Sequence, residues 1–301
     1  MVTSAATYRG VYDALGEGKD CSTEDRHVAD RLAEVLPGGA AGTKALSGLL
    51  RGFVKRAGRM MIDAEVGQFL VCGVDLSLRE PLHEFLQRCS GPDRDTPRVI
   101  YLDDDPAATA LARTSIGAGN SSIRAALVDH RDPPSAMTAP VDGDREPDSG
   151  DETVRDCLDS ERPIGLIHCG LLPHLGDSSE PAVMVDLLRR WDALLPQGSF
   201  IALSHFCVPP SNPPLAAVAA KVEEIFTESA LGAGVFLTPE QFTELFCGHA
   251  LIQPAQGYLR EVVPVDRFWP GGPALDRHSA GVAALLWGGV ARKGAPFGLL
   301  G

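Results

Sequence analysis

Short apolar runs recur along this chain from about residue 68, and polar and apolar positions at helical spacing follow most of them. Apolar runs of this length, bounded by glycine, proline or acidic residues, are typical of buried strands. The predicted strands are 68–72, 99–102, 123–128, 164–169 and 200–203, and the predicted helices between them are 79–88, 106–113 and 181–195. This alternation predicts a mostly parallel sheet with right-handed crossovers.

The N-terminal part of the chain has a different pattern. Two amphipathic helices are predicted at 24–36 and 45–61, and they follow a glycine-rich charged stretch, 12–20, that we interpret as a loop. We therefore divide the chain into an N-terminal helical cap, 1–63, and an α/β domain, 64–301.

The C-terminal part predicts two helices and then two strands. The helices are expected at 215–228 and 239–247, and the strands at 251–265 and 282–291. Because no full helix separates these strands, they predict an antiparallel hairpin on one edge of the sheet.

One segment inside the α/β domain has a composition unlike the rest. Residues 134–152 are rich in proline, glycine and acidic side chains, which predicts a mobile surface loop. A short helix is expected after it, near 154–158.

The turn after the first strand is the most informative stretch. Gly73 ends this strand, and the second strand ends at Asp103, Asp104 and Asp105. Strand, glycine turn, helix, strand and acid form the opening of a doubly wound nucleotide-binding sheet. Such a turn usually has a second glycine where the backbone approaches the ligand, and here Asp75 stands near that point.

Charge and cysteine content narrow the class of protein. The net charge of −13 argues against nucleic acid or an anionic membrane as a partner, and is compatible with a cationic small substrate. The seven cysteines are dispersed and form no Cys-x-x-Cys pair, so we expect buried thiols, no metal and a reducing cytoplasmic location. The first ten residues contain no apolar core typical of a signal peptide, and no apolar run reaches membrane-spanning length.

Five segments in order carry a resemblance to a known family. They are Gly18-Lys-Asp20, Ile100 to Pro106, Asp129-His-Arg-Asp-Pro133, Leu203-Ser-His205 and Gly289 to Lys293. Together they resemble the S-adenosylmethionine (SAM)-dependent methyltransferases that are common in actinobacteria. The resemblance runs from about residue 12 to 293. It implies a class I methyltransferase sheet of seven strands with an N-terminal helical cap.

The resemblance also implies a binding site for SAM. Asp103 matches the acid that accepts the ribose hydroxyl groups, and Asp129 and His130 match positions that flank the adenine. We add Lys19, Asp20, Gly73 and Asp104 as candidate cofactor- or substrate-binding residues. The family's turn reads Phe-Leu-Asp-Ile-Gly-Thr-Gly, where this chain has Val71 for the acid and Asp75 for the second glycine. Glu17 replaces a glycine of the family's N-terminal segment.

These departures motivate a hypothesis about the chemistry. If Glu17, Asp75 and the acids at 103–105 converge on one cleft, the cleft favours a small amine-bearing substrate, and some of its carboxylates can act as bases. Such a site can align an amine against a leaving group within one substrate, so the favoured interpretation is ring closure without SAM in specialised biosynthesis. The alternatives are a SAM-dependent N- or O-methyltransferase and a non-catalytic partner subunit, with a homo- or hetero-oligomer left open.

Two histidines complete the candidate catalytic set with Glu17 and Asp75. His174 and His205 follow the fourth and fifth strands, on the side of the sheet where ligands bind, and either can serve as a general base. Each candidate also has a structural interpretation. Asp75 and Asp104 can cap helices, Glu17 and Lys19 can belong to an exposed loop, and both histidines can pack in the core.

Overall fold

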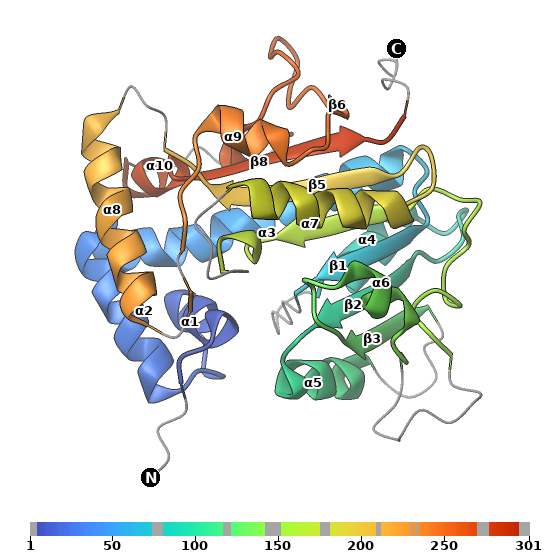
Figure 1. Ribbon diagram of the computed structural model, residues 1–301, viewed down its shortest axis with the longest axis horizontal. Coiled ribbons are helices and arrows are strands. Elements are labelled where there is room, and N and C mark those ends of the chain that lie inside the picture. The colour runs from blue at the N-terminus through green and yellow to red at the C-terminus, as the bar shows by residue number, and fades with distance from the viewer. Residues whose placement is uncertain are drawn as a thin grey trace.

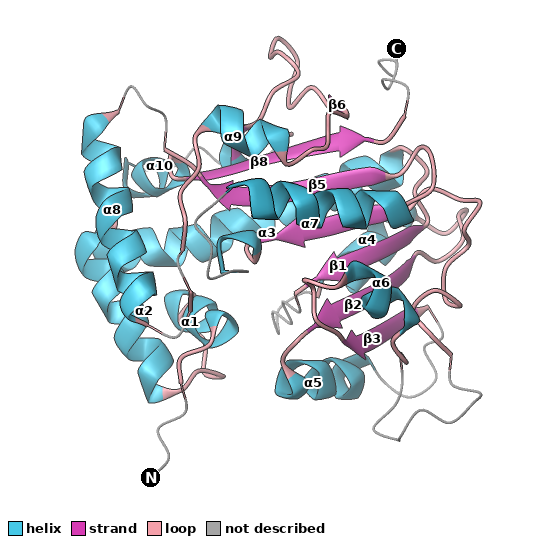
Figure 2. Cartoon of the chain, in the orientation of Figure 1, coloured by secondary structure: helices cyan, strands magenta, loops and turns pink. Residues whose placement is uncertain are grey.

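The computed structural model is built on a mostly parallel sheet with helices on both faces (Figures 1 and 2). It describes residues 5–73, 81–116, 122–141, 152–174, 181–208, 212–229, 231–232, 234–269 and 277–294. Within these ranges the sheet has eight strands in the order β3-β2-β1-β4-β5-β8-β6, and β7 pairs with β8. The strands are β1 Gln68–Cys72, β2 Arg98–Asp103, β3 Ile123–Leu127, β4 Gly165–Cys169, β5 Phe200–Phe206, β6 Ala250–Leu251, β7 Val263–Pro264 and β8 Leu286–Arg292.

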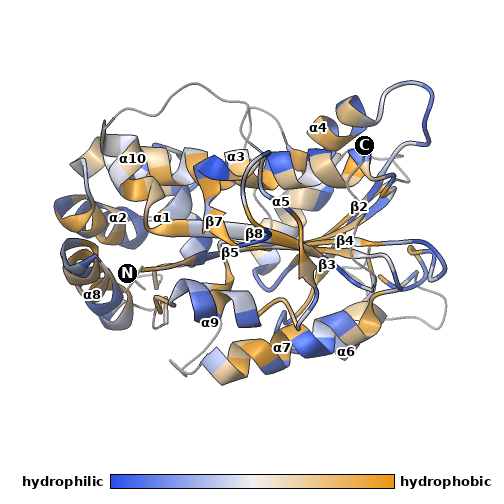
Figure 3. Ribbon diagram, turned by 90° about the horizontal axis from the view of Figure 1, so that it is seen from above, coloured by the Kyte–Doolittle hydropathy of each residue, from blue (hydrophilic) through white to orange (hydrophobic). Residues whose placement is uncertain are grey.

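The helices form a layer on each face of the sheet and a group at one end (Figure 3). The α-helices are α1 Tyr8–Leu15, α2 Thr23–Val35, α3 Gly39–Asp63, α4 Leu82–Ser90, α5 Pro106–Ile116, α6 Pro133–Thr138, α7 Pro181–Leu194, α8 Pro213–Glu228, α9 Pro239–Glu244 and α10 Arg277–Ala283. Two short 3-10 helices are η1 Leu172–His174 and η2 Val265–Arg267. Helices α3, α4, α5 and α10 cover one face, and α6, α7 and α9 cover the other. No helix in the described part of the chain combines the length and the apolar character needed to cross a membrane.

The strands are apolar on both faces because both faces are covered. In β1, Phe69 and Val71 belong to the core on the α3 side, while Leu70 and Cys72 belong to the core on the α7 side. All four are at most 5% exposed. Continuous apolar runs, rather than alternating ones, are therefore the expected signature of these strands, and the sequence shows that signature.

Helices α1, α2 and α8 gather at the end of the sheet toward which β1, β2 and β3 point (Figure 1). Asp25 of α2 is 4% exposed, and its carboxylate accepts the backbone N–H of Thr7 (2.8 Å) and that of Ser22 (2.7 Å). A Cβ added at Gly10 of α1 would lie 2.1 Å from Asp25 Oδ2. This close approach holds α1 against α2 over the carboxyl ends of the parallel strands.

The predicted fold class is confirmed, with several corrections of detail. The sheet has eight strands rather than seven, because two short strands, β6 and β7, replace the single predicted strand 251–265. Residues 154–157 form turns instead of a helix. The predicted loop 12–20 is helical up to Leu15. Of the predicted loop 134–152, residues 134–138 lie in α6 and 142–151 fall outside the described residues.

The C-terminal hairpin is confirmed as antiparallel pairing around β8. This strand begins at Leu286 rather than near Val282, because residues 277–283 form α10. It pairs antiparallel with β5, β6 and β7. Pairing with β8 also extends β5 to Phe206, three residues past its predicted end.

The proposed boundary between cap and α/β domain falls at the end of α3. Helix α3 is 25 residues long, and it packs against α1 and α2 as well as against β4, β5 and β8. One helix thus carries contacts of both regions and links the cap to the sheet.

Candidate functional site

The carboxyl ends of the parallel strands bring candidate residues together beneath α1. Gly73 directly follows β1; its backbone is left-handed with φ +84°, and its N–H donates to Leu102 O (2.8 Å). A Cβ added at Gly73 would lie 3.0 Å from Tyr8 Oη. Glycine therefore allows the close approach of α1 to this turn. Asp75 lies outside the described residues.

Asp103 ends β2 beside this turn and is fully buried. Its Oδ1 accepts the backbone N–H of Asp105 (2.9 Å), and its main-chain oxygen accepts that of Val128 (2.8 Å). Burial raises the pKa of Tyr8 well above its usual value, and the nearby carboxylates of Asp103 and Asp104 raise it further. The Tyr8 hydroxyl thus stays protonated near Asp103 and can donate a hydrogen bond.

Asp104 and His130 lie next to Asp103. One carboxylate oxygen of each aspartate and one ring nitrogen of His130 lie within 4.8 Å of one another. Asp104 is exposed; partial desolvation raises its pKa, and the Asp129 carboxylate adds to the increase. His130 is fully buried, which lowers its pKa to about 4. Neither ring nitrogen of His130 has a hydrogen-bond partner among the described residues.

A small cavity of about 70 Å³ borders Gly73 and lies between α3 and the ends of β1 and β4. Its walls include Gly73, Cys169, Arg51 and Lys55. Arg51 Nη2 donates to Ser47 Oγ (2.6 Å), one turn earlier on α3. Arg51 and Lys55 therefore line a cavity next to the ends of β1 and β4, with Lys55 Nζ 5.4 Å from the centroid of the Phe85 ring, whereas the acids gather at the end of β2.

His174 follows β4 in η1 and lies among aromatic rings. Its ring stacks on Tyr8 with centroids 6.3 Å apart, and Tyr12, Phe206 and Phe226 contact it edge-on at 6.1, 6.3 and 4.8 Å. Burial lowers its pKa to about 4. Nδ1 lies 3.2 Å from the main-chain oxygen of Leu231, which selects the tautomer protonated at Nδ1. The unprotonated Nε2, which is buried and without a partner in the described chain, is then a proton acceptor.

The remaining predicted residues lie elsewhere. Glu17 pairs with Lys44 at the surface, with 69% of its side chain exposed, so its carboxylate is already committed to a cation. Lys19 and Asp20 are exposed in the turn after α1, where Asp20 N donates to Asp13 Oδ2 (2.9 Å).

The two other predicted site residues, Asp129 and His205, already contact neighbouring side chains. Asp129 forms an ion pair with Arg131 (2.8 Å), which lowers the pKa of the carboxylate. His205 lies inside β5 rather than after it, fully buried, and its ring faces Phe242 of α9. The longer strand places His205 in the core.

Sequence reasoning missed Tyr8, Arg51 and Lys55. They come from helices that precede β1, and only packing of α1 and α3 on the sheet brings them to Gly73 and Asp103. One local signal was present: Arg51 and Lys55 are four residues apart, which places them on one face of α3.

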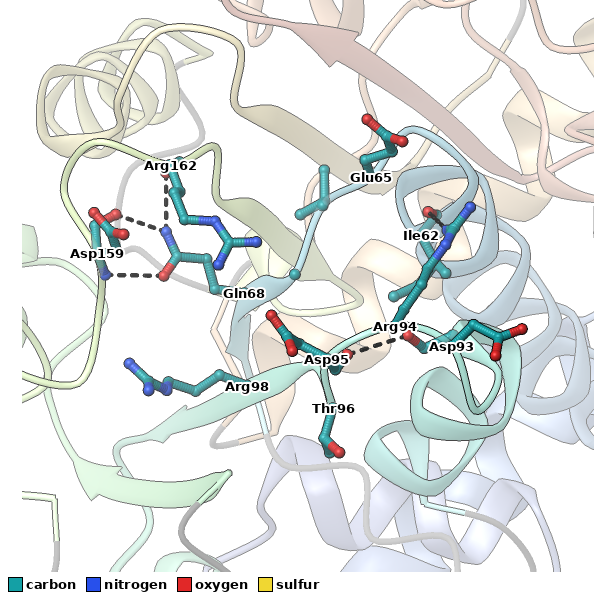
Figure 4. A pocket seen from close by; sticks show the side chains of 13 residues that line it. Ile62, Glu65, Gln68, Asp93, Arg94, Asp95, Thr96, Arg98, Asp159 and Arg162 are labelled. Carbon is teal, nitrogen blue, oxygen red and sulfur yellow. Dashed lines mark hydrogen bonds between the residues drawn. The ribbon is translucent and has the colours of Figure 1, made fainter.

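A larger cavity of about 700 Å³ lies at the opposite edge of the sheet, where β1 and β2 begin (Figure 4). Gln68 in its wall is 5% exposed, and its amide is bound by main-chain atoms of Asp159 and Arg162 at 2.7 to 2.9 Å. The cavity is lined by three arginines and four acidic residues. Since ligands of parallel α/β sheets bind at the carboxyl ends, this cavity is not the candidate site.

The comparisons with known proteins agree with the fold. A family model described as S-adenosyl methyltransferase matches residues 1–294. The chain belongs to this methyltransferase family. A search of curated proteins found no match.

Two solved structures are similar to this methyltransferase-family chain over nearly its whole length. One, from Thermobifida fusca YX and provisionally named a methyltransferase, is 26% identical with a TM-score of 0.75, and the match covers 97% of this chain and 96% of that one. The other, a DUF574 family protein from Streptomyces avermitilis MA-4680, is 25% identical with a TM-score of 0.71, covering 97% of this chain and 99% of that one. Family membership favours the SAM-dependent alternative over ring closure without SAM.

Proposed function

We propose that this protein is a SAM-dependent methyltransferase whose cofactor lies along the carboxyl ends of β1, β2 and β4. The observation that carries the proposal is Asp103, a fully buried carboxylate at the end of β2. It lies near the Tyr8 hydroxyl, which itself stands over the left-handed Gly73. A buried acid at this point in a doubly wound sheet suits a ribose diol, because a carboxylate accepts two hydrogen bonds.

The order of charges along the edge supports one orientation of the cofactor. Acids lie at the end of β2, and Arg51 and Lys55 line the cavity beside Gly73 and the ends of β1 and β4. SAM has a ribose near one end and a carboxylate at the other, so this order matches the molecule. We infer that Asp103 holds the ribose end, that His130 lies toward the adenine, and that Arg51 and Lys55 attract the methionine carboxylate. When bound, SAM supplies an electrophilic methyl group.

We infer that His174, whose ring stacks on Tyr8, is the side chain that moves a proton. A hydroxyl acceptor must lose its proton to give a neutral product, and an ammonium acceptor must lose one to become a neutral amine. Nε2 of the neutral imidazole can take this proton. The aromatic rings of Tyr8, Tyr12 and Phe226 around it exclude water from that proton transfer. We propose a small amine-bearing metabolite as the acceptor, supported by the net charge of −13 and by the acids at the edge.

Calorimetric titration of the full chain with SAM, and with its demethylated product, tests the proposal. We expect binding of one molecule per chain. Asp103→Asn should weaken it about 10- to 100-fold, since hydrogen bonds to a charged acceptor contribute about 1.5–3 kcal/mol. The matched control is Asp186→Asn, which makes the same change on α7, where Asp186 is 70% exposed and paired with Arg190. A folded protein that binds neither compound would refute the proposal and restore the hypothesis of substitution without SAM.

A further inference from the structure

Asp103, Asp104 and His130 bring three possible metal-ligand atoms together beside the end of β2. Their three ligand atoms lie within 4.8 Å of one another, although Asp104 and His130 are 26 positions apart in the sequence. His130 forms no hydrogen bond with either carboxylate.

His130 is the observation that points to a ligand. The side chain is fully buried, and both ring nitrogens lack a partner in the described chain. Its main-chain oxygen is engaged, since Trp191 Nε1 donates to it at 3.3 Å, so the backbone of this loop is held while the ring is not. Leaving a buried polar group unpaired costs about 1–3 kcal/mol, which a bound ligand would recover.

We propose that Asp103, Asp104 and His130 bind one divalent first-row transition-metal ion, such as Mn²⁺, when SAM is absent. The two carboxylates neutralise the ion's charge, the imidazole nitrogen adds a neutral ligand, and further positions are left to water. A mixed oxygen and nitrogen donor set suits Mn²⁺ and its neighbours better than Ca²⁺ or Mg²⁺, which prefer oxygen ligands.

The three side chains must move closer together to hold such an ion. Metal bonds to carboxylate oxygen or imidazole nitrogen are about 2.0–2.2 Å long, so two ligand atoms on one ion are separated by at most about 4.4 Å. Three ligand atoms spaced evenly around one ion are about 3.8 Å apart at most, so donors that lie up to 4.8 Å apart must close by up to about 1 Å. Asp104 is exposed and can rotate toward the two buried groups. Asp103 is already oriented by the Asp105 N–H, as metal-binding carboxylates commonly are by an outer hydrogen bond.

The metal site would affect SAM binding. Only this effect, and not the metal site itself, rests on the proposed function. Asp103 would serve both the metal ion and the ribose of SAM. The two ligands must then exclude each other, so Mn²⁺ should act as a competitive inhibitor toward SAM.

Electron paramagnetic resonance of Mn²⁺ tests the site directly, because the signal of the free aqueous ion decreases on binding. The full chain, treated with EDTA and desalted, is titrated with Mn²⁺ in the absence of SAM. We expect one ion per chain, with electron spin-echo modulation from an imidazole nitrogen. His130→Gln should abolish the nitrogen modulation, and Asp104→Asn should weaken binding at least tenfold. The matched control, His27→Gln, alters an exposed histidine on α2 and should change neither.

The outcomes separate this proposal from the proposed function. No bound ion at millimolar Mn²⁺, or binding that both His130→Gln and Asp104→Asn leave intact, would overturn the metal site. If circular dichroism shows that the His130→Gln variant does not fold, Mn²⁺ binding by the variant Asp104→Asn, which changes an exposed residue, decides the test. SAM binding without Mn²⁺ binding removes the metal site and leaves the methyltransferase proposal standing. Bound Mn²⁺ that SAM does not displace supports the site and contradicts the shared use of Asp103.

Discussion

Acid should unfold this protein through its buried histidines. His130, His168 and His205 are each fully buried, and burial lowers their pKa values to about 4, 3 and 4. In the unfolded chain each titrates near 6.5. The unfolded state therefore binds more protons between about pH 6.5 and 4. Stability is fully present above pH 6.5 and is lost as the pH falls through this window.

The size of the loss follows from these values. Between pH 8 and pH 5, one histidine with a pKa near 6.5 unfolded and 3–4 folded contributes about 2 kcal/mol of destabilisation. Three such groups give about 6 kcal/mol, which is comparable with the total stability of about 5–15 kcal/mol of an ordinary domain. We therefore expect the free energy of unfolding to fall steeply below pH 6.5.

His168→Leu isolates one of the three groups. His168 has no partner for either ring nitrogen in the described chain, so an apolar side chain of similar size should keep the stability at pH 8 within about 1 kcal/mol. The slope of stability against pH near pH 5.5 should fall by about 1.4 kcal/mol per pH unit, the value for one proton.

Urea unfolding at a series of pH values between 8 and 5, with EDTA present, measures this slope. The fluorescence of Trp191, which is fully buried, is a suitable signal. The control is His27→Leu on the exposed side of α2, which should leave the slope unchanged. A stability that does not decrease below pH 6.5, or an equal slope with and without His168, would refute the reasoning.

The other predictions concern the proposed cofactor and acceptor sites. Gly73→Ala should weaken SAM binding and lower stability by about 1–2 kcal/mol, because it adds a Cβ at positive φ that meets a side chain. The control Gly91→Ala, at φ +74° with open space around it, should change only stability, and equal SAM affinities of the two variants would contradict this prediction. His174→Gln should lower kcat at least tenfold while the Kd for SAM measured by calorimetry stays the same; an unchanged kcat would exclude proton transfer to this residue. Arg51→Met should weaken SAM but not adenosine, which lacks a carboxylate, and the control Arg59→Met on the same helix should weaken neither; equal losses for both ligands would point to a packing defect.

The central strands were predictable because the signal for each is local. A buried parallel strand needs apolar side chains on both faces, and such a run is visible in the four consecutive residues 69–72 of β1. The ends were less predictable where pairing is not local. β5 continues to Phe206 because β8, which begins 80 residues later, pairs with it.

Predictions from single motifs were also correct in position where the feature is local, and incorrect where distant residues decide the position. The glycine after β1 and the acid after β2 are where the pattern placed them, since each is defined by the end of its own strand. Glu17 was expected to join these acids, but Lys44 of α3 binds its carboxylate at the surface. His205 was expected at the edge, and the extension of β5 places it in the core.

Taken alone, the order of residues determined the alternation of strands and helices, the family, and the position of Asp103 at the end of a strand. Those features depend on residues a few positions apart, whose periodicity is recorded directly in the chain. Only the tertiary structure decided that Tyr8, Arg51 and Lys55 lie around Gly73 and Asp103, and that His130 shares a space with two carboxylates. Such groupings arise when separate strands end at one edge and helices pack over them, and sequence spacing carries no measure of that distance.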